Sequence, residues 1–557
     1  MNRANMQGAS ENLDRLACFT YGVGQEREGL CLLAQLGPHR IMLDCGLASL
    51  EKILLDHSQQ YPAEFVFCSH AHPDHARGLL EFNRAFPEIP IYASFVTTKL
   101  LPLNWQNEPC SEIAKLCQPL PWGQSSQLAP DLSVQLFPAG HIPGAACIFL
   151  TYTSPKRTYK LLYTGDFSVS NFQLVEGLSI EALRGLAPDV LIIEGSYGTA
   201  RHPHRRQQEK HLMEVLSETL ANGTNILLPV PTLGLGQEIL KLLRSHHKFT
   251  GRDLDIWVDG NIADACDIYL ELLSQFPVSV QNFAKHQPLF WDERICPRMR
   301  RLSDRDLLNP DRPCILLSDR PVVELKKYLQ TRKGAWSILI PQHPRDLFAI
   351  DPLAIFPASD AEKITVQNYL LAEHSDGRNT TQLIHNIRPQ HIIFVHGSAT
   401  YLADLTNLEE LQNRYQLHSP RNNTLVELPL GEKFLQPAPP TQTTCEGELN
   451  ELGSSITITL PNAIGSDPRW HNFADTGLVE ARWQGEELVL RGISQRELLA
   501  ANSESKRLVD LDCCGNCRHY KNQHCFNPSS PLYEFKVTSE GYCPVFEPAL
   551  PSDRRNV

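Results

Sequence analysis

The sequence lacks three features that would assign it to a particular class of protein. None of its apolar runs reaches the roughly 18 residues that a membrane-spanning helix needs. Its first 15 residues contain no apolar core of the kind found in a signal peptide. It has no excess of positive charge: the net charge of −12 argues against a general nucleic-acid coat protein. We therefore expect a cytoplasmic protein without a membrane partner, in which any polyanion binds to a local basic patch.

The size and composition are those of an ordinary globular protein with several domains. A chain of 557 residues is too long for one core, so two or three domains are expected. Hydrophobic residues make up 42% and charged residues 20%. Ten of the 16 cysteines lie singly between residues 18 and 314, many within apolar runs, and we expect them to be reduced core residues. The other six lie after residue 440.

The segment that indicates chemistry is residues 69–75, Ser-His-Ala-His-Pro-Asp-His. It follows residues 64–68, whose aromatic and β-branched side chains predict a buried strand. Imidazole and carboxylate groups are the ligands that Zn²⁺ prefers when no thiolate is present. A loop at the end of a strand can direct all of them into one concavity, so this segment predicts a metal site.

Three further segments place His or Asp directly after a predicted strand. They are residues 41–46, 139–145 and 163–167, which contain Asp44, His141 and Asp166. Together with His-x-His-x-Asp-His, these segments resemble the signatures of the metallo-β-lactamase superfamily, in the expected order. The resemblance implies an αββα sandwich of two mixed sheets. Without the later segments, Asp44 would be interpreted as a turn residue before Gly46.

The middle of the chain resembles one branch of that superfamily. Residues 188–198, 372–376 and 392–397 resemble motifs A, B and C of the β-CASP group, which cuts nucleic acids; they contain Glu194, His374 and His396. Between motifs A and B, a predicted helix and predicted strands alternate as in a doubly wound domain. We expect a β-CASP-like cap at residues 200–365, inserted between residues 1–199 and 366–432 of the first domain.

The resemblance also implies a role for each side chain of the site. His70, His72 and His141 would hold one zinc ion, Asp74, His75 and His396 the second, and Asp166 would bridge them. A bridging hydroxide would be the nucleophile of a two-metal reaction. His374 would be the general acid, oriented by Glu194, although taken alone it would be interpreted as a surface histidine. Asp44 would hydrogen-bond to the ligands or to the metal-bound water.

Arginines after motif A and in the cap are candidates for contacting the substrate. They are Arg201, Arg205 and Arg206, and Arg294, Arg298, Arg300 and Arg301. Such runs are more often solvated faces of helices. The chain also departs from the family pattern, with Leu235 where nuclease relatives commonly carry Arg and Glu373 where motif B usually has a small residue. These departures leave the metal ligands intact and concern the substrate channel.

The end of the chain has a different composition. A Pro-rich linker is predicted at residues 433–452 and a small β-rich segment at 453–500. Residues 510–550 hold Cys514, Cys517, Cys525 and Cys543, an arrangement that predicts a Cys₄ site for zinc or an iron–sulfur cluster. A pair of cysteines joined by a disulfide is the alternative.

The sequence as a whole favours a zinc-dependent phosphodiesterase that cuts single-stranded RNA in RNA processing or decay. A small-molecule hydrolase of the same fold and a catalytically silent RNA-binding scaffold are the alternatives. DNA as substrate and a homodimer are both left open.

Overall fold

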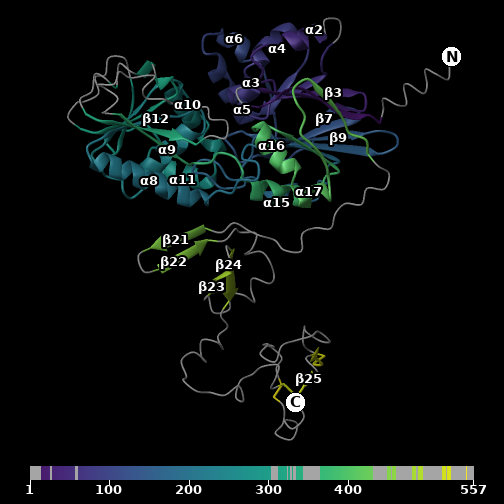
Figure 1. Cartoon of the computed structure of the whole chain (residues 1–557). Helices are drawn as coiled ribbons and strands as arrows, with labels where there is room; N and C mark the ends of the chain where they lie inside the picture. Colours follow the sequence, from purple (N-terminus) through teal and green to yellow (C-terminus); the bar gives the residue numbers. More distant parts are fainter. Residues whose placement is uncertain are drawn as a thin grey trace, which may run out of the picture. The chain divides into compact units, whose positions relative to one another are not determined.

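The computed structural model describes residues 14–25, 28–56, 61–302, 312–322, 324–325, 329, 334–342, 364–430, 448–452, 455–459, 479–484, 487–492, 517–521, 524–528 and 547–548. The chain divides into two compact units, Met1–Thr443 and Thr444–Val557. The first unit contains three sheets (Figure 1).

The first sheet has seven strands in the order β20-β1-β2-β3-β4-β5-β6. Their bounds are β1 Leu16–Val23, β2 Leu30–Leu36, β3 His39–Leu43, β4 Phe65–Phe67, β5 Ile91–Ser94, β6 Gln118–Leu120 and β20 Thr424–Glu427. Strands β1 to β3 form the antiparallel meander that the alternating apolar segments predict. From β3 to β6 the strands run parallel, and the intervening segments cross over outside the sheet.

The second sheet also has seven strands, in the order β19-β18-β11-β10-β9-β8-β7. Their bounds are β7 Ser126–Ala129, β8 Leu132–Pro138, β9 Ala146–Thr153, β10 Thr158–Tyr163, β11 Val190–Glu194, β18 His391–Val395 and β19 Gln416–His418. Strands β8, β10, β11 and β18 point the same way, since β9 is antiparallel to both β8 and β10 while β10, β11 and β18 are parallel. Their carboxyl ends therefore meet at one edge of the sheet.

The two sheets share one apolar core. Alternate residues of β2 (Leu30, Leu32) and of β11 (Val190, Ile192) belong to the same buried cluster. The residues between them, such as Cys31 and Leu191, belong to a second cluster on the outer, helix-covered faces. A strand that is buried on both faces must be apolar throughout, which explains the uninterrupted run Val190–Ile193. This is the predicted sandwich.

The cap contains the third sheet, in which six strands are all parallel in the order β14-β13-β15-β12-β16-β17. Their bounds are β12 Asn225–Pro229, β13 Asp255–Val258, β14 Arg298–Arg301, β15 Cys314–Ser318, β16 Trp336–Pro341 and β17 Ile364–Tyr369. Figure 1 shows helices α8, α9, α10 and α11 around this sheet. The doubly wound insert is confirmed. Its last strand, β17, continues past residue 365, where the sequence predicts the end of the cap.

The helices connect these strands. In the sandwich they are α2 Glu51–Asp56, α3 Pro73–Ala76, α4 Leu79–Ala85, α5 Phe95–Leu100, α6 Cys110–Ile113, α7 Ile180–Leu183, α15 Gly377–Ile387, α16 Ala399–Thr406 and α17 Glu409–Gln412, with a 3₁₀ turn at Leu101–Trp105. In the cap they are α8 Arg205–Ala221, α9 Leu235–Ser245, α10 Gly260–Glu271 and α11 Val278–His286, with a 3₁₀ turn at Leu273–Gln275. Within the described parts of the chain, no helix combines the length and apolarity needed to cross a membrane.

The second unit is described only as three antiparallel strand pairs. They are β21 Glu448–Leu452 with β22 Ser455–Thr459, β23 Val479–Gln484 with β24 Glu487–Gly492, and β25 Tyr520–Lys521 with β26 His524–Cys525. Strand β21 occupies the last residues of the segment predicted as a Pro-rich linker. Cys517 and Cys525 have free thiols, whereas Cys514 and Cys543 lie outside the described residues, so the Cys₄ site stays a prediction.

Candidate metal centre

The carboxyl ends of strands from both sheets bring seven potential metal ligands together. β4 leads to His70 and His72, and α3 supplies Asp74 and His75. The second sheet adds His141 after β8, Asp166 after β10 and His396 after β18. The ligand atoms form overlapping groups, within each of which all lie within 4.8 Å of one another: His70 with His72, His141 and Asp166; Asp74 with His75 and His396; and Asp166 with Glu194, His374 and His396.

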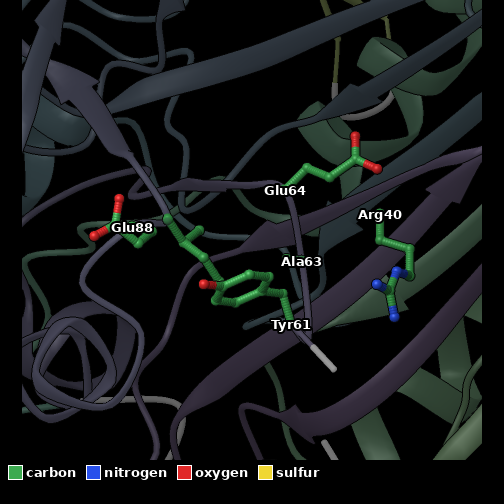
Figure 2. A pocket seen from close by; sticks show the side chains of 6 residues that line it. Arg40, Tyr61, Ala63, Glu64 and Glu88 are labelled. Atoms are coloured by element: carbon green, nitrogen blue, oxygen red, sulfur yellow. The ribbon is translucent and has the colours of Figure 1, made fainter. Parts of the chain in front are cut away.

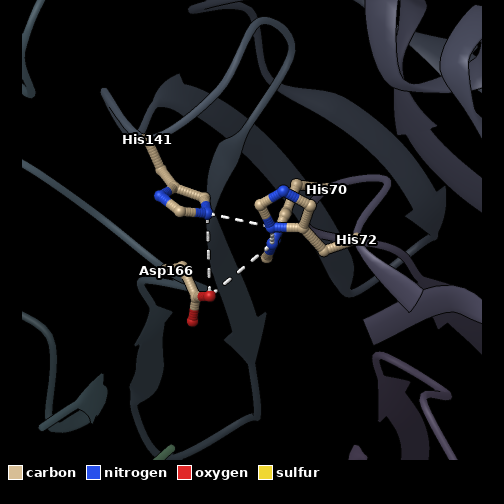
Figure 3. A group of neighbouring side chains, drawn as sticks. All are labelled: His70, His72, His141 and Asp166. Atoms are coloured by element: carbon tan, nitrogen blue, oxygen red, sulfur yellow. Dashed lines mark hydrogen bonds and ion pairs between the residues drawn. The ribbon is translucent and has the colours of Figure 1, made fainter. Parts of the chain in front are cut away.

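The first group consists of three imidazoles and one carboxylate that face one another (Figure 3). His72 Nδ1 lies 3.1 Å from His70 Nε2 and 3.1 Å from His141 Nε2. Asp166 Oδ2 lies 3.6 Å from His70 Nε2 and 3.8 Å from His141 Nε2. A tetrahedral Zn²⁺ with bonds of about 2.0–2.1 Å would hold its nitrogens about 3.3 Å apart, so the spacing fits that ion.

The ring nitrogens that face away from this group bond to oxygens. His141 Nδ1 donates to the carbonyl of Glu373 over 2.8 Å, and His72 Nε2 lies 3.3 Å from the carbonyl of Leu233. A neutral imidazole carries one proton, so the nitrogens that face inward offer lone pairs. Burial supports the neutral form, because it lowers the pKa of His72 to about 4 and that of His141 to about 3.

Asp44 fixes the tautomers of His70 and His75. Its carboxylate accepts from the Ser69 backbone N–H over 2.6 Å, from the Ser69 hydroxyl over 2.7 Å and from His75 Nδ1 over 2.7 Å. The Ser69 hydroxyl has donated its proton to Asp44, so His70 Nδ1, 3.0 Å away, must donate to Ser69 Oγ. The Nε2 atoms of both histidines therefore point inward as acceptors, as the predicted role of Asp44 requires.

Ser196 does the same for His396. The Ser196 hydroxyl donates to Glu194, and His396 Nδ1, 2.9 Å from Ser196 Oγ, is therefore the donor in that contact. The lone pair of His396 Nε2 then faces Asp74 Oδ2 over 3.2 Å. Two acceptors this close repel each other unless a cation lies between them. Ser196 was not predicted from the sequence, and its place two residues after a strand-end carboxylate is the only local signal for it.

Two buried polar atoms of the centre have no hydrogen-bond partner among the described residues, His75 Nε2 and Asp166 Oδ1. Burial lowers the pKa of His75, but Asp166 and Asp44 outweigh that effect and raise it well above its usual value. The two carboxylates therefore favour a cation at His75 Nε2, which can be a proton or a metal ion. The donor set, the tautomers and the orphaned atoms all fit divalent metal ions.

His374 and Glu194 lie beside the metal ligands. His374 Nδ1 is 2.9 Å from Glu194 Oε2 and 3.9 Å from Asp166 Oδ2. Burial lowers the pKa of His374, but Glu194 outweighs it, and the pKa rises to about 9. Glu194 also accepts from the backbone N–H of Phe167 over 2.6 Å. An imidazolium held by a buried carboxylate is equipped to donate a proton.

The backbone is left-handed at two strand ends of the centre. Asp44 and His396 have φ angles of 59° and 52°. A residue other than Gly in this region costs about 1–3 kcal/mol and persists only where its surroundings impose it. Gly46 lies close by, and a Cβ atom there would be 1.7 Å from the carbonyl oxygen of Asp74. The loop that contains Gly46 and the loop that contains Asp74 can therefore lie this close only because residue 46 is a glycine.

The two departures from the family pattern meet at the seam between cap and sandwich. The backbone N–H of Leu235 bonds to the Glu373 carboxylate, and burial raises the pKa of Glu373 to about 7. Between them, Gly234 has a φ of 88°, and a Cβ atom there would lie 2.9 Å from Glu373 Oε1. The cap loop that carries Leu233 and Gly234 therefore covers the first ligand group.

The predicted basic clusters have different environments. Arg201, Arg206 and Arg294 are exposed. Contrary to expectation, Arg205 is buried. In the second cluster, Arg298 pairs with Asp253 and Asp255, Arg300 lies 3.9 Å from Asp255, and Arg301 pairs with Asp267.

A surface hollow of about 460 Å³ lies apart from the metal ligands (Figure 2). Its lining consists of Arg40, Tyr61, Ala63, Glu64, Glu88 and Ile89. Glu64 is engaged there by His39 Nδ1 over 2.7 Å. None of the lining residues belongs to the metal centre.

Comparison with known proteins identifies the family. Residues 39–221 match the family described as the beta-lactamase superfamily domain. The chain is 50% identical over 547 residues to "Uncharacterized protein sll0514" from Synechocystis sp., covering 96% of this chain and 97% of that protein. It is 28% identical over 329 residues to an RNase J-like protein from Methanocaldococcus jannaschii, covering 56% of this chain and 73% of that one.

The chain belongs to the metallo-β-lactamase superfamily, in its β-CASP group. A further similarity, 29% identity over 259 residues, is to "Probable RNase MJ4" from the same archaeon and covers 43% of this chain and 58% of that protein. As a member of this superfamily with the described His and Asp cluster, the protein is a metal-dependent hydrolase.

Proposed function

We propose that this protein is a zinc-dependent phosphodiesterase that cuts RNA. The observation that carries the proposal is the set of five histidines, each of which gives its N–H to an oxygen and turns its second nitrogen towards Asp74 or Asp166 or towards another imidazole. Nitrogen and carboxylate ligands suit zinc. Two relatives named as RNases support RNA as the substrate.

The ligands would divide between two ions that share Asp166. His70, His72 and His141 would hold one, and Asp74, His75 and His396 the other. When bound, the two ions would supply a water of lowered pKa and positive charge for the phosphate oxygens. The remaining chemistry falls to the protein's own side chains.

His374 would protonate the leaving 3′ oxygen. The water oxygen would bond to phosphorus as the bond between phosphorus and the 3′ oxygen breaks. The leaving 3′ oxygen would take the proton on Nε2 of the His374 imidazolium, because Nδ1 faces Glu194. Glu194 keeps the ring oriented and favours its protonated form. Asp44 and Ser196 hold the tautomers of the ligand histidines and do not touch the substrate.

Arg201 and Arg206 are the arginines that we propose as contacts for the RNA backbone. Both are exposed; Arg201 lies four residues before α8 and Arg206 in its first turn. The backbone N–H of His202, next to Arg201, donates to the Asp376 carboxylate over 3.2 Å. Asp376 follows His374 by two residues, so this bond holds the Arg201 segment near the proposed proton donor. Phosphate contacts from such arginines would make binding depend on salt.

The test is cleavage of end-labelled single-stranded RNA and the matching DNA by the zinc-loaded protein, beside a His72→Ala/Asp166→Ala double variant. We expect RNA cleavage that the double variant loses, and the product ladder would give the polarity. Intact RNA together with hydrolysis of a thioester or lactone would assign the site to small molecules. Intact substrates with two zinc ions bound would favour an RNA-binding scaffold.

A further inference from the structure

Side chains from the cap hold a residue that lies two positions before His374. The backbone N–H of Ala372 donates to Gln208 Oε1 over 2.8 Å, and Arg205 Nη1 donates to the carbonyl of Ala372 over 2.6 Å. Arg205 and Gln208 are three residues apart, so they lie on the same face of α8. Both polar backbone atoms of one residue are thus held by one turn of a cap helix.

Both side chains are themselves fixed. Gln208 Nε2 donates to the carbonyl of Pro203 over 2.6 Å, which leaves its oxygen for Ala372. The Arg205 guanidinium lies 4.3 Å from the centroid of the Phe172 ring, and its Nε donates to Glu209 over 3.2 Å. Arg205 and Gln208 are each 6% exposed. A guanidinium placed in this way cannot reach an RNA strand in solvent, which is why the sequence-based expectation for Arg205 does not hold.

The cap and the sandwich meet along this seam. Glu238 of α9 accepts from the backbone N–H groups of Gln173 and Leu174 over 2.6 and 2.8 Å. Glu238 Oε2 lies 3.7 Å from Arg205 Nη2. The cap is thus bonded both to the loop after Asp166 and to the segment between β17 and His374.

The segment is also fixed on the other side of His374. The backbone N–H of Ser375 donates to the carbonyl of Phe167 over 2.9 Å, and Ser375 Oγ accepts from Val169 over 3.1 Å. His374 therefore lies between one anchor from the cap and one from the sandwich. Releasing the Ala372 anchor would let the ring move relative to Glu194. The ligand His141 donates to the carbonyl of Glu373 in the same segment, so zinc content has to be measured beside activity.

We propose that Arg205 and Gln208 are positioning residues for His374, so that the cap sets the geometry of proton donation as well as covering the site. The inference rests on the proposed role of His374 as the proton donor. Its consequence is selective: it affects substrates whose leaving oxygen needs a proton. Hydrolysis of bis(4-nitrophenyl) phosphate does not need one, because 4-nitrophenolate departs as a stable anion.

The experiment compares RNA with bis(4-nitrophenyl) phosphate in the full chain loaded with zinc. Gln208→Met removes the acceptor for Ala372 at nearly constant volume, and Gln207→Met is the matched control, since Gln207 is exposed on the same helix. We expect Gln208→Met to lower kcat on RNA about 10- to 100-fold with KM unchanged, since small displacements of a general acid have effects of this size. Its kcat on the nitrophenyl ester should fall less than about threefold.

Two further variants separate the possible results. Arg205→Lys keeps the charge and should retain more RNA cleavage than Arg205→Met, and zinc content and thermal unfolding show whether each variant folds. Equal losses on both substrates, or no loss for Gln208→Met, would overturn the inference. If His374→Ala lowers both activities equally, the proposed proton donor is wrong and the positioning role falls with it. If the wild type hydrolyses the ester and not RNA, the proposed function fails instead.

Discussion

Replacing Asp44 by Asn should weaken metal binding by reversing the tautomer of His75 and, through the Ser69 hydroxyl, that of His70. The backbone N–H of Ser69 can only donate, so the oxygen of the Asn amide must face it. The NH₂ of the amide then faces His75 Nδ1. His75 then has to accept at Nδ1 and carry its proton on Nε2, where it points at Asp166, 3.3 Å away, in place of a metal. The change keeps the size and shape of the side chain.

The magnitude follows from the role of such partners. Loss of the hydrogen bond that orients a metal-bound histidine typically lowers metal affinity 10- to 100-fold, or about 1.4–2.8 kcal/mol. We expect a loss of this size for the more weakly bound of two zinc equivalents, measured by titrating the apo-protein in competition with a chromophoric chelator. The other equivalent should weaken too, because the amide NH₂ would also face Ser69 Oγ, whose proton would then turn to His70 Nδ1.

Tyr163→Phe is the control. Its hydroxyl donates to the same Asp44 oxygen, but its removal leaves the bond from His75 Nδ1 to Asp44 intact. We expect zinc affinity within about threefold of the wild type and a stability loss of about 1 kcal/mol. If Asp44→Asn binds both equivalents as tightly as the wild type, the tautomer argument is refuted.

Three other predictions concern packing, binding and pH. Gly46→Ala should lower the unfolding free energy by about 3 kcal/mol in urea titrations because its Cβ meets backbone, whereas Gly123→Ala, in open space at a φ of 67°, should cost only about 1 kcal/mol. Arg201→Gln should raise KM for RNA about 3- to 10-fold and reduce its salt dependence, while Arg298→Gln, which removes an ion-paired arginine of the cap, should change neither. Burial, and then the imidazole of His391, lower the pKa of His418 to about 4 from an unfolded value near 6.5. The stability that His418 contributes is therefore present above pH 6.5 and lost as the pH falls towards 4. Between pH 7 and 5, the His418→Gln variant should lose less unfolding free energy than the wild type.

The sequence predicts the strands and the ligand-bearing loops because both depend on local rules. Buried strands have apolar runs of recognisable length, and the carboxyl end of a strand is where a side chain can leave the sheet for a site. Val190–Glu194 shows both features within five residues. The ligand positions therefore follow from the order of residues along the chain, even where the ligands are more than 300 residues apart.

The hydrogen bonds around the ligands cannot be predicted in this way. The carbonyl of Leu233 that meets His72 and the hydroxyl of Ser196 that meets His396 come from distant segments. Helix α8 shows the same limit, because charge and polarity assign Arg205 and Gln208 to solvent. They are buried because the backbone of Ala372, more than 160 residues further along, supplies their partners. Burial of a polar side chain depends on such partners and not on periodicity.

The insertion of the cap between β11 and β18 also has a consequence during synthesis of the chain. His396 lies beyond the whole cap, and its backbone N–H donates to the carbonyl of Val23 in the first strand over 2.7 Å. The second metal position is therefore incomplete until nearly 400 residues have left the ribosome and the cap has brought its two ends together. A nascent or truncated chain that ends before His396 would contain the first ligand group but only Asp74 and His75 of the second, so hydrolytic activity would begin only with a fully assembled domain.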